Sequence, residues 1–194
     1  MYNSLEEIII KYGLNGFWID GGGTDKVDEH SYTPYYNKIF SPFREKECHI
    51  LEIGTWTGAF LFAMAKFMPK ATFVTLDIQQ KFSDRILLQL GPNKTTNHQL
   101  VNAYTFETLK LIEDQQFDFI IDDGTHIVSD GLFVFYHYMK LLKPDGKMVI
   151  EDLDENAVKL LLPHVDPKQF TITIVDGRAV KNRGDDMLVE ITRN

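Results

Sequence analysis

Cysteine is almost absent from this sequence, since Cys48 is the one cysteine in 194 residues. A single thiol cannot form an intramolecular disulfide, so the disulfide-rich scaffolds of small secreted proteins are excluded. Cys48 directly precedes an apolar run, and we expect it to be a small buried side chain. This cysteine usage is typical of a reducing compartment, and we predict a cytoplasmic protein.

Long apolar runs and basic clusters are also missing. No stretch approaches the roughly 20 apolar residues of a membrane-spanning helix, and the first residues do not combine a basic region with an apolar one. Lys and Arg number 20 against 28 Asp and Glu, which gives a formal net charge of -8. Phosphate backbones and anionic membranes attract clustered basic faces. We therefore expect neither nucleic acid nor a membrane as a partner.

The sequence does contain a regular alternation of apolar runs and amphipathic stretches. Strands are predicted at 49–54, 72–78, 99–103, 117–122, 147–151, 170–175 and 187–192. Helices are predicted at 58–68, 82–90, 106–114, 128–142 and 155–162, with turns at Gly91-Pro92 and Pro144-Asp145-Gly146. Repeated strand-helix units build a parallel sheet, whereas two final strands without a helix between them must pair antiparallel. The prediction is an α/β fold, a doubly wound and mostly parallel seven-stranded sheet with a C-terminal antiparallel hairpin.

The length fits one domain with a sizeable core, because 44% of the 194 residues are hydrophobic. We divide this single domain, 1–194, into an N-terminal cap that contacts substrate (1–46) and a core for cofactor binding and catalysis (47–194). The cap contains Gly21-Gly22-Gly23, which lacks the Lys-Ser or Lys-Thr of a P-loop. We expect a flexible loop there.

Two of the predicted strands end in carboxylates. The first strand, 117–122, ends in Asp122 and is followed by Asp123 and, shortly after, His126. The second strand, 147–151, ends in Glu151 and is followed by Asp152. The carboxyl ends of parallel strands meet at one edge of a sheet, so these side chains should line one site. Carboxylate oxygens bind hard cations such as Mg²⁺, and a histidine can accept a proton. The pattern therefore predicts a metal ion beside a proton acceptor.

A glycine turn follows the first predicted strand. Segment 52–58 holds Glu52, Gly54 and Gly58 between a strand and a helix. Glycines let the backbone approach a ligand, and the carboxylate of Glu52 can bind a ligand's ammonium group. The spacing is not Gly-x-Gly-x-x-Gly, which disfavours a dinucleotide-binding dehydrogenase. Asp77 ends the next strand, where it could accept hydrogen bonds from two ribose hydroxyls or cap the following segment.

Together these motifs resemble the class I S-adenosylmethionine-dependent methyltransferases, with 52–58 similar to their first motif. Segments 122–126, 141–146 and 149–153 look like those of the magnesium-dependent sugar O-methyltransferases that act on macrolide antibiotics. Segment 23–40 is similar to the stretch that precedes the first motif in that family. The resemblance covers most of the chain. It implies a Rossmann-like fold, S-adenosylmethionine as cofactor, and Mg²⁺ or another divalent cation.

The resemblance also implies roles for individual residues. The cofactor-binding set is Glu52, Gly54, Thr55, Gly58, Asp77, Ala103, Tyr104 and Asp122. The metal set is Asp123 and Asp152, with Glu151 as a third member, and the catalytic set is His126 as general base and Asp123. In this scheme the metal orients two vicinal hydroxyls and lowers their pKa. His126 then removes a proton as the oxygen attacks the sulfonium methyl.

Side-chain alternation leaves other roles open for several of these residues. Asp122 and Asp123 cannot both face a metal if their strand continues regularly, so we expect Asp122 to be structural and to bond the 52–58 loop. Glu151, beside Asp152, could for the same reason be a ligand or a support. Asp123 could instead cap the helix that begins near 128, and His126 could be a structural residue at that helix start.

The predicted function is an S-adenosylmethionine-dependent, metal-assisted O-methyltransferase acting on a hydroxyl of a sugar or glycosylated small molecule. The chain has little room for lids over a bulky antibiotic, which favours a smaller sugar or polyol as substrate. One alternative is a catechol-type O-methyltransferase, since a diphenol also offers vicinal hydroxyls to one ion. Another is a non-catalytic module that binds a cofactor or sugar. The family resemblance further implies self-association into a homo-oligomer.

Overall fold

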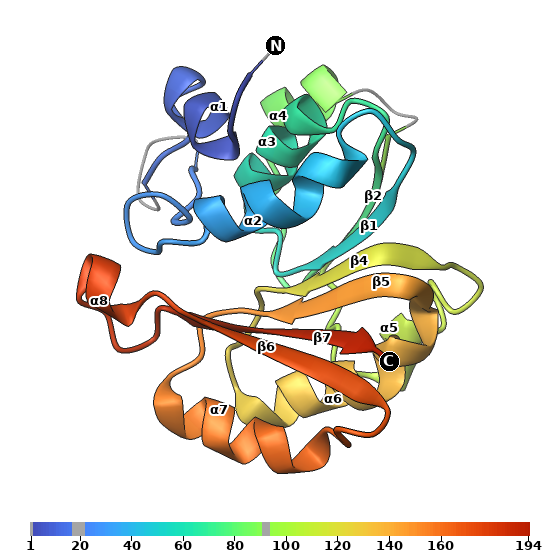
Figure 1. Ribbon diagram of the computed structural model, residues 1–194. Helices are drawn as coiled ribbons and strands as arrows, with labels where there is room; N and C mark the ends of the chain where they lie inside the picture. The colour runs from blue at the N-terminus through green and yellow to red at the C-terminus, as the bar shows by residue number, and fades with distance from the viewer. Residues whose placement is uncertain (1, 17–21, 91–93) are drawn as a thin grey trace.

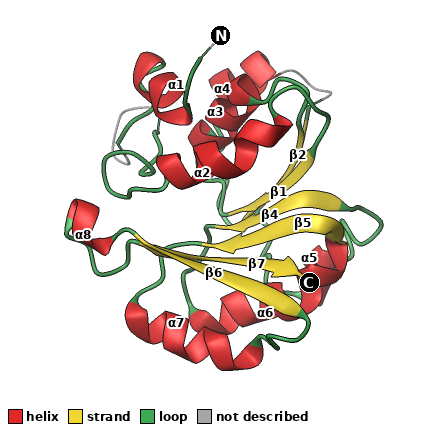
Figure 2. Cartoon of the chain, in the orientation of Figure 1, coloured by secondary structure: helices red, strands yellow, loops and turns green. Residues whose placement is uncertain are grey.

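The computed structural model describes residues 2–16, 22–90 and 94–194, and shows one sheet between two layers of helices (Figures 1 and 2). The strands are β1 (His49–Ile53), β2 (Thr72–Asp77), β3 (Thr95–Gln99), β4 (Phe117–Asp122), β5 (Leu142–Ile150), β6 (Phe170–Asp176) and β7 (Met187–Arg193). The α-helices are α1 (Leu5–Lys11), α2 (Thr33–Phe40), α3 (Ala59–Phe67), α4 (Asp84–Leu90), α5 (Phe106–Leu109), α6 (Val128–Tyr138), α7 (Glu155–Leu161) and α8 (Arg178–Lys181). Short 3-10 helices cover Ser41–Phe43, Met139–Leu141 and Leu162–His164. The predicted turn at Gly91-Pro92 and the first glycine of the predicted loop, Gly21, lie outside the described residues.

The strand order is β3-β2-β1-β4-β5-β7-β6. Strands β1 to β5 pair in parallel, whereas β7 runs antiparallel to both β5 and β6. This confirms the doubly wound, mostly parallel sheet with its C-terminal hairpin. The chain order reverses between the neighbours β1 and β4, and ligand crevices form at the carboxyl ends of strands at such a reversal.

Side chains along the central strands alternate between two cores. Ile50 of β1 and Phe119 of β4 pack with α1 to α4 on the upper face of the sheet in Figure 1. Leu51 and Ile120 point the other way and pack with α5, α6 and α7. Strands covered on both faces are continuously apolar, which is why their positions could be recognised from sequence.

Several predicted boundaries are wrong. β3 ends at Gln99, where the predicted strand began, because it is a polar edge strand that pairs with β2 on one side and lacks a continuous apolar run. The predicted helix at 106–114 shortens to the four-residue α5. β5 begins at Leu142 and includes the predicted turn at 144–146. The short α8 interrupts the connection between β6 and β7, which still pair antiparallel.

Two N-terminal helices, α1 and α2, were not predicted, because seven and eight residues are too few for a clear helical period. Both pack over the same face of the sheet as α3, with Leu5, Ile8, Tyr36 and Phe40 fully buried. Their packing holds segment 22–32 across the carboxyl ends of the central strands, as its contacts with residues there show.

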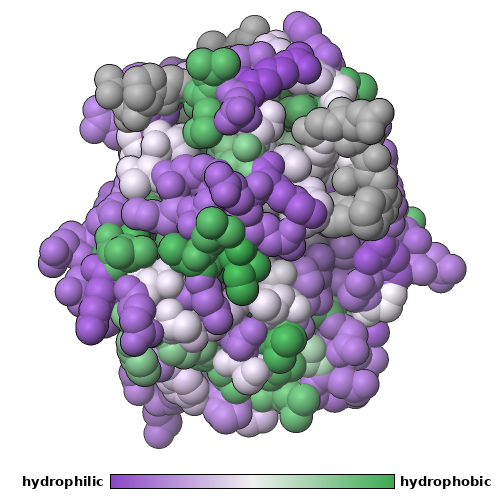
Figure 3. Space-filling model, turned by 180° about the vertical axis from the view of Figure 1, so that it is seen from behind, coloured by the Kyte–Doolittle hydropathy of each residue, from purple (hydrophilic) through white to green (hydrophobic). Residues whose placement is uncertain are grey.

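No helix within the described ranges is long and apolar enough to cross a bilayer. The face shown in Figure 3 is largely hydrophilic with separate hydrophobic patches. Large exposed apolar side chains come from different elements, such as Leu88 of α4, Leu160 of α7 and Val180 of α8. These side chains are scattered, whereas the buried apolar side chains form the two cores on either face of the sheet.

Gly54, in the loop after β1, packs directly against the loop after β4. Its φ is +80°, a left-handed value, and a Cβ at this position would lie 2.0 Å from the carbonyl oxygen of Asp123. Only glycine combines this backbone conformation with such a close approach. This close approach fixes the position of the loop after β1 relative to the loop after β4.

We predict that Gly54→Ala lowers the free energy of unfolding by about 3 kcal/mol or more, because backbone strain adds to a clash with backbone atoms. Gly13→Ala is the matched control for strain alone, since Gly13 has φ +63° and open space around it. That control should cost about 1 kcal/mol. Gly184→Ala, with open space and no such φ, should stay within about 0.5 kcal/mol. Equal urea denaturation midpoints for the Gly54 and Gly13 variants would contradict the predicted close approach.

Candidate active site

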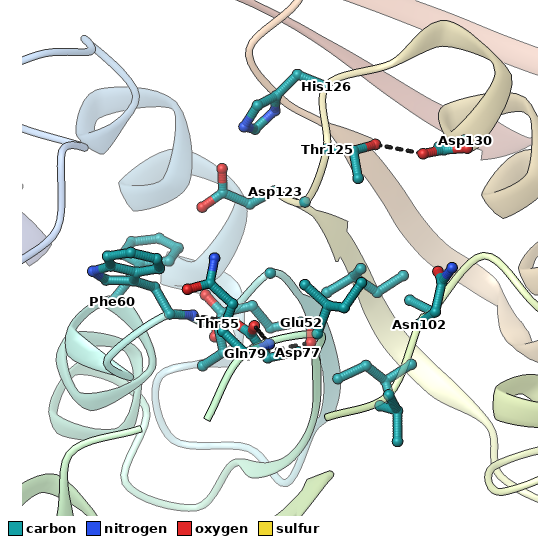
Figure 4. Close-up of a pocket in the computed structure, with 18 of the residues that line it drawn as sticks. Glu52, Thr55, Phe60, Asp77, Gln79, Asn102, Asp123, Thr125, His126 and Asp130 are labelled. Atoms are coloured by element: carbon teal, nitrogen blue, oxygen red, sulfur yellow. Dashed lines mark hydrogen bonds between the residues drawn. The ribbon is translucent and has the colours of Figure 1, made fainter. Parts of the chain in front are cut away.

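A cavity of about 390 Å³ opens at the carboxyl ends of β1, β2 and β4. Its walls are segment 23–25, the loop after β1 with the start of α3, the end of β2, segment 101–104 and the loop after β4. In Figure 4, Glu52, Thr55 and Asp77 lie at one end of the cavity, and Asp123 and His126 lie above them. A concave site of this size with a few convergent polar groups suits a small molecule.

Glu52 is a buried acid that faces the cavity with one oxygen unsatisfied. Its side chain is 2% exposed, and its Oε2 has no hydrogen-bond partner among the described residues. Burial raises the pKa of Glu52 to about 8 despite the opposing effect of nearby Lys26. A buried carboxylate without a partner is unfavourable unless a cation or donor completes it. Glu52 therefore fits the ammonium group of a bound ligand.

Asp77 lies at the end of β2 and organises the turns around the cavity. Its Oδ2 accepts a hydrogen bond from the backbone N–H of Trp56 at 2.6 Å, and its Oδ1 accepts one from the N–H of Gln79 at 2.7 Å. α4 begins later, at Asp84, so Asp77 does not cap that helix. Each carboxylate oxygen has further acceptor capacity, which leaves Asp77 able to bind hydroxyl groups.

The other predicted cofactor-binding residues divide into two groups. Gly54, Thr55, Ala103 and Tyr104 line the cavity. Gly58 and Asp122 lie outside its lining. Gly58 instead allows a turn at φ +82° against the ring of Phe82.

The carboxylate of Asp122 points away from the cavity. It accepts a hydrogen bond from the Tyr104 hydroxyl at 2.9 Å, and burial raises its pKa to about 7. Its side-chain partner is thus Tyr104 and not the 52–58 loop. Because β4 ends at Asp122, the chain turns and Asp123 faces a different direction. The predicted separation of roles between these two neighbours agrees with the geometry.

Asp123 and His126 lie at the upper edge of the cavity and come together there with Asp152, which is outside the cavity lining. One ligand atom from each of the three lies within 4.8 Å of the others, and His126 Nε2 is 3.7 Å from Asp152 Oδ2. Two carboxylates and an imidazole at this separation fit a divalent cation. Figure 4 shows the His126 ring and the Asp123 carboxylate directed toward one another.

The backbone at this cluster is unusual. His126 has φ +58° and Asp152 has φ +54°, values that non-glycine residues seldom adopt and that often mark functional sites. α6 begins at Val128 with Ile127 as its N-cap, so neither Asp123 nor His126 caps it. Burial lowers the pKa of His126, which keeps its imidazole neutral and able to accept a proton at neutral pH.

Glu151 is separate from this cluster. It is fully buried, receives a hydrogen bond from the Tyr36 hydroxyl, and forms an ion pair with Lys26 at 2.8 Å. The group that could hold a cation contains Asp152 and Asp123 but not Glu151. Of the two roles predicted for Glu151, these contacts favour support.

Lys26 was missed by the sequence analysis. Its Nζ lies 2.7 Å from Asp123 Oδ2, 2.8 Å from Glu151 Oε2 and 3.3 Å from Asp25 Oδ1, and its side chain is 1% exposed. Burial alone would lower the pKa of Lys26, but the surrounding carboxylates raise it well above the usual range. The excess of acidic strand ends was the available signal, because buried carboxylates require a counter-charge.

Further residues of the N-terminal segment hold Asp152. The Tyr32 hydroxyl donates to Asp152 Oδ1 at 2.8 Å. His30 is buried between Asp152 and Asp186, with ring nitrogens 3.4 Å from an oxygen of each. His30 and Asp25 form a second triad of close ligand atoms with Asp152. The N-terminal segment thus completes the site formed by the strand ends.

Comparison with known proteins identifies relatives of this sequence. It is 27% identical over 150 residues to the mycinamicin VI 2''-O-methyltransferase of Micromonospora griseorubida, a match covering 64% of this chain and 32% of that protein. It is 29% identical over 134 residues to the demethylmacrocin O-methyltransferase of Streptomyces fradiae, with the same coverage of 64% and 32%. The chain therefore spans about a third of the length of these relatives.

Solved structures show the same fold. MycE methyltransferase from the mycinamycin biosynthetic pathway, in complex with Mg, SAH and mycinamycin VI, superimposes with a TM-score of 0.72 at 20% identity, covering 98% of this chain and 54% of that one. A ribosomal protein L11 methylase from Lactobacillus delbrueckii subsp. bulgaricus gives 0.57 at 17% identity, covering 77% and 71%. The sequence model of a family described as a methyltransferase domain matches residues 51–153. The chain thus belongs to this methyltransferase-domain family and has the class I methyltransferase fold.

Proposed function

We propose that this chain is an S-adenosylmethionine-dependent, metal-assisted O-methyltransferase that acts on a hydroxyl of a sugar or glycosylated small molecule. The observation that carries the proposal is a cavity with Glu52 at one end, whose Oε2 has no hydrogen-bond partner among the described residues, and with Asp123 and His126, which group with Asp152, at the other. The two curated relatives described above are both named as O-methyltransferases, which supports the same reaction class.

The lower part of the cavity suits the methyl donor. Glu52 would hold the ammonium group of its amino-acid moiety, and Asp77 would accept hydrogen bonds from the ribose hydroxyls. Ala103 and Tyr104 line the cavity beyond Asp77, where an adenine ring would pack. Gly54 and Thr55 bring backbone close to the ligand. When bound, S-adenosylmethionine supplies an activated methyl group on its sulfonium, so the chain needs no covalent nucleophile.

The upper edge suits a hydroxyl acceptor. Asp123 and Asp152 would hold the divalent ion, which lowers the pKa of a coordinated hydroxyl. His126 would accept the hydroxyl proton at Nε2, since its lowered pKa favours the neutral ring. Asp123 also fixes the position of the acceptor relative to the cavity. Orientation at short range is the main contribution expected of these residues.

We further propose that residues 1–46 act as a cap over the acceptor within one domain. The contacts of Lys26 and Tyr32 with the acidic cluster support this assignment. The net charge of -8 favours a small neutral acceptor over nucleic acid. Homo-oligomer formation and a cytoplasmic location remain predictions.

The direct test is formation of S-adenosylhomocysteine from S-adenosylmethionine with simple methyl glycosides, with and without Mg²⁺. Turnover with a glycoside that stops on adding EDTA and returns with Mg²⁺ would support the proposal. Asp123→Asn and Asp152→Asn should each remove the response to Mg²⁺. Turnover with catechol alone would favour the catechol-type alternative. Cofactor binding without turnover on any acceptor in a broad panel would favour a non-catalytic module.

We predict that binding of S-adenosylhomocysteine at pH 7 releases a proton from Glu52. The pKa of Glu52 is raised to about 8 in the free protein, and a bound ammonium lowers it by favouring the charged form. Affinity should therefore rise about tenfold between pH 6.5 and pH 8. Calorimetry in buffers of different ionisation enthalpy measures the release directly. Glu52→Gln should bind more weakly and lose the proton release, and unchanged release in that variant would assign it to another group.

We predict that His126→Gln lowers kcat by about 10² to 10⁴-fold and leaves S-adenosylhomocysteine affinity within about threefold. The loss should come from proton removal, because His126 lies at the cluster and not beside Glu52. His164→Gln is the matched control, since His164 is exposed and far along the chain in the 3-10 helix after α7. If His126→Gln instead weakens Mn²⁺ binding more than tenfold, the imidazole is a metal ligand and not the base.

A further inference from the structure

Lys26 provides a cation inside the acidic cluster without lining the cavity. Its side chain is 1% exposed and the paired Glu151 side chain is 0% exposed. The rings of Tyr32 and Phe60 lie 5.8 and 5.7 Å from its Nζ, so water has little access to the ammonium. Lys26 therefore acts on its carboxylate neighbours and does not touch a ligand in the cavity.

The Lys26 ammonium affects two nearby carboxylates, Glu151 and Asp123, in different ways. Glu151 is held by Lys26 and by the Tyr36 hydroxyl, and lies outside both groups of close ligand atoms. Asp123 is shared, because its Oδ2 contacts Lys26 at 2.7 Å while the residue also belongs to the group with His126 and Asp152. A positive charge this close to a shared ligand opposes the binding of a second cation.

We infer that Lys26 determines the composition and strength of the metal site, an inference that rests on the metal-assisted function proposed above. The Lys26 ammonium occupies the space beside the Glu151 carboxylate. Without Lys26, the ion could bind there and take Glu151 as a third carboxylate ligand. Lys26 confines a divalent cation to the carboxylates of Asp123 and Asp152, beside the His126 imidazole. The result is a weak site that releases its ion readily.

A purely structural role for Lys26 makes the opposite prediction for metal binding. If Lys26 only pinned the N-terminal segment to β4 and β5, its removal would disorder Asp123 and weaken the site. If it competes with the ion, its removal frees Glu151 and adds a negative charge to the site. Direct measurement of metal affinity separates the two roles without reference to activity.

The experiment is calorimetric titration of Mn²⁺ and Mg²⁺ into the full chain at pH 7.5. Lys26→Met should bind Mn²⁺ at least tenfold more tightly than the wild-type chain, and Lys26→Met with Glu151→Gln should lose that gain. Lys159→Met is the control for loss of a positive charge, since Lys159 forms an exposed pair with Glu155. Equal or weaker Mn²⁺ binding by Lys26→Met would overturn the inference.

Glu151→Gln alone keeps the test decisive if Lys26→Met does not fold. Lys26 already excludes Glu151 from the ion, so this variant should keep Mn²⁺ affinity within fivefold of the wild-type value. A larger loss would show that Glu151 is a ligand and would overturn the inference. Failure of the metal-assisted function would appear differently, as absence of Mn²⁺ binding to the wild-type chain. Tight binding by Lys26→Met in that case would still support the role of Lys26.

Discussion

The arrangement of the site depends on one constraint: the negative charge of the carboxylates at the ends of the parallel strands must be compensated. Asp123, Glu151 and Asp152 converge at one edge of the sheet, where burial of an uncompensated carboxylate is strongly unfavourable. Lys26 supplies the positive charge, and the Tyr32 and Tyr36 hydroxyls supply donors. The N-terminal segment is therefore part of the site. The contacts that attach this segment are the same contacts that pair these carboxylates.

Neighbouring acidic residues point in different directions because the backbone leaves the strand at these positions, within the pair after β4 and just before the pair after β5. β4 ends at Asp122, which bonds Tyr104, whereas Asp123 faces the cavity. β5 ends at Ile150, after which Glu151 is buried against Lys26 and Asp152 takes a left-handed conformation beside His126. Strand alternation indicated that each pair would separate, and the departure of the backbone from the strand determines where each carboxylate points.

The two ends of the cavity are electrostatically distinct. Glu52 Oε2 has no hydrogen-bond partner among the described residues and burial raises the pKa of Glu52 to about 8, so a positive ligand group would complete this end. At the opposite end, the Lys26 ammonium lies behind the cavity lining and pairs directly with Asp123. Under the proposed function, a cationic ligand group would be directed toward Glu52, and a divalent ion or a neutral hydroxyl would bind near Asp123 and Asp152. This difference would orient the two reactants in the cavity.

The sequence by itself determined the α/β class, the central strands and the acidic strand ends. This was possible because each buried parallel strand is a run of consecutive apolar residues, which is visible locally in the sequence. The places of Asp77, Asp123, His126 and Asp152 at or shortly after strand ends, and the resemblance of segment 52–58 to a family motif, also made these residues and Glu52 candidates for the site. The polar edge strand β3 and the short helices α1 and α2 lacked such a pattern. Only the tertiary structure decided that Lys26 pairs with Asp123, 97 residues away in the chain, and that Glu151 pairs with Lys26 and stays outside the group of Asp123, His126 and Asp152. Pairing of buried charges depends on proximity in space, which no local period records.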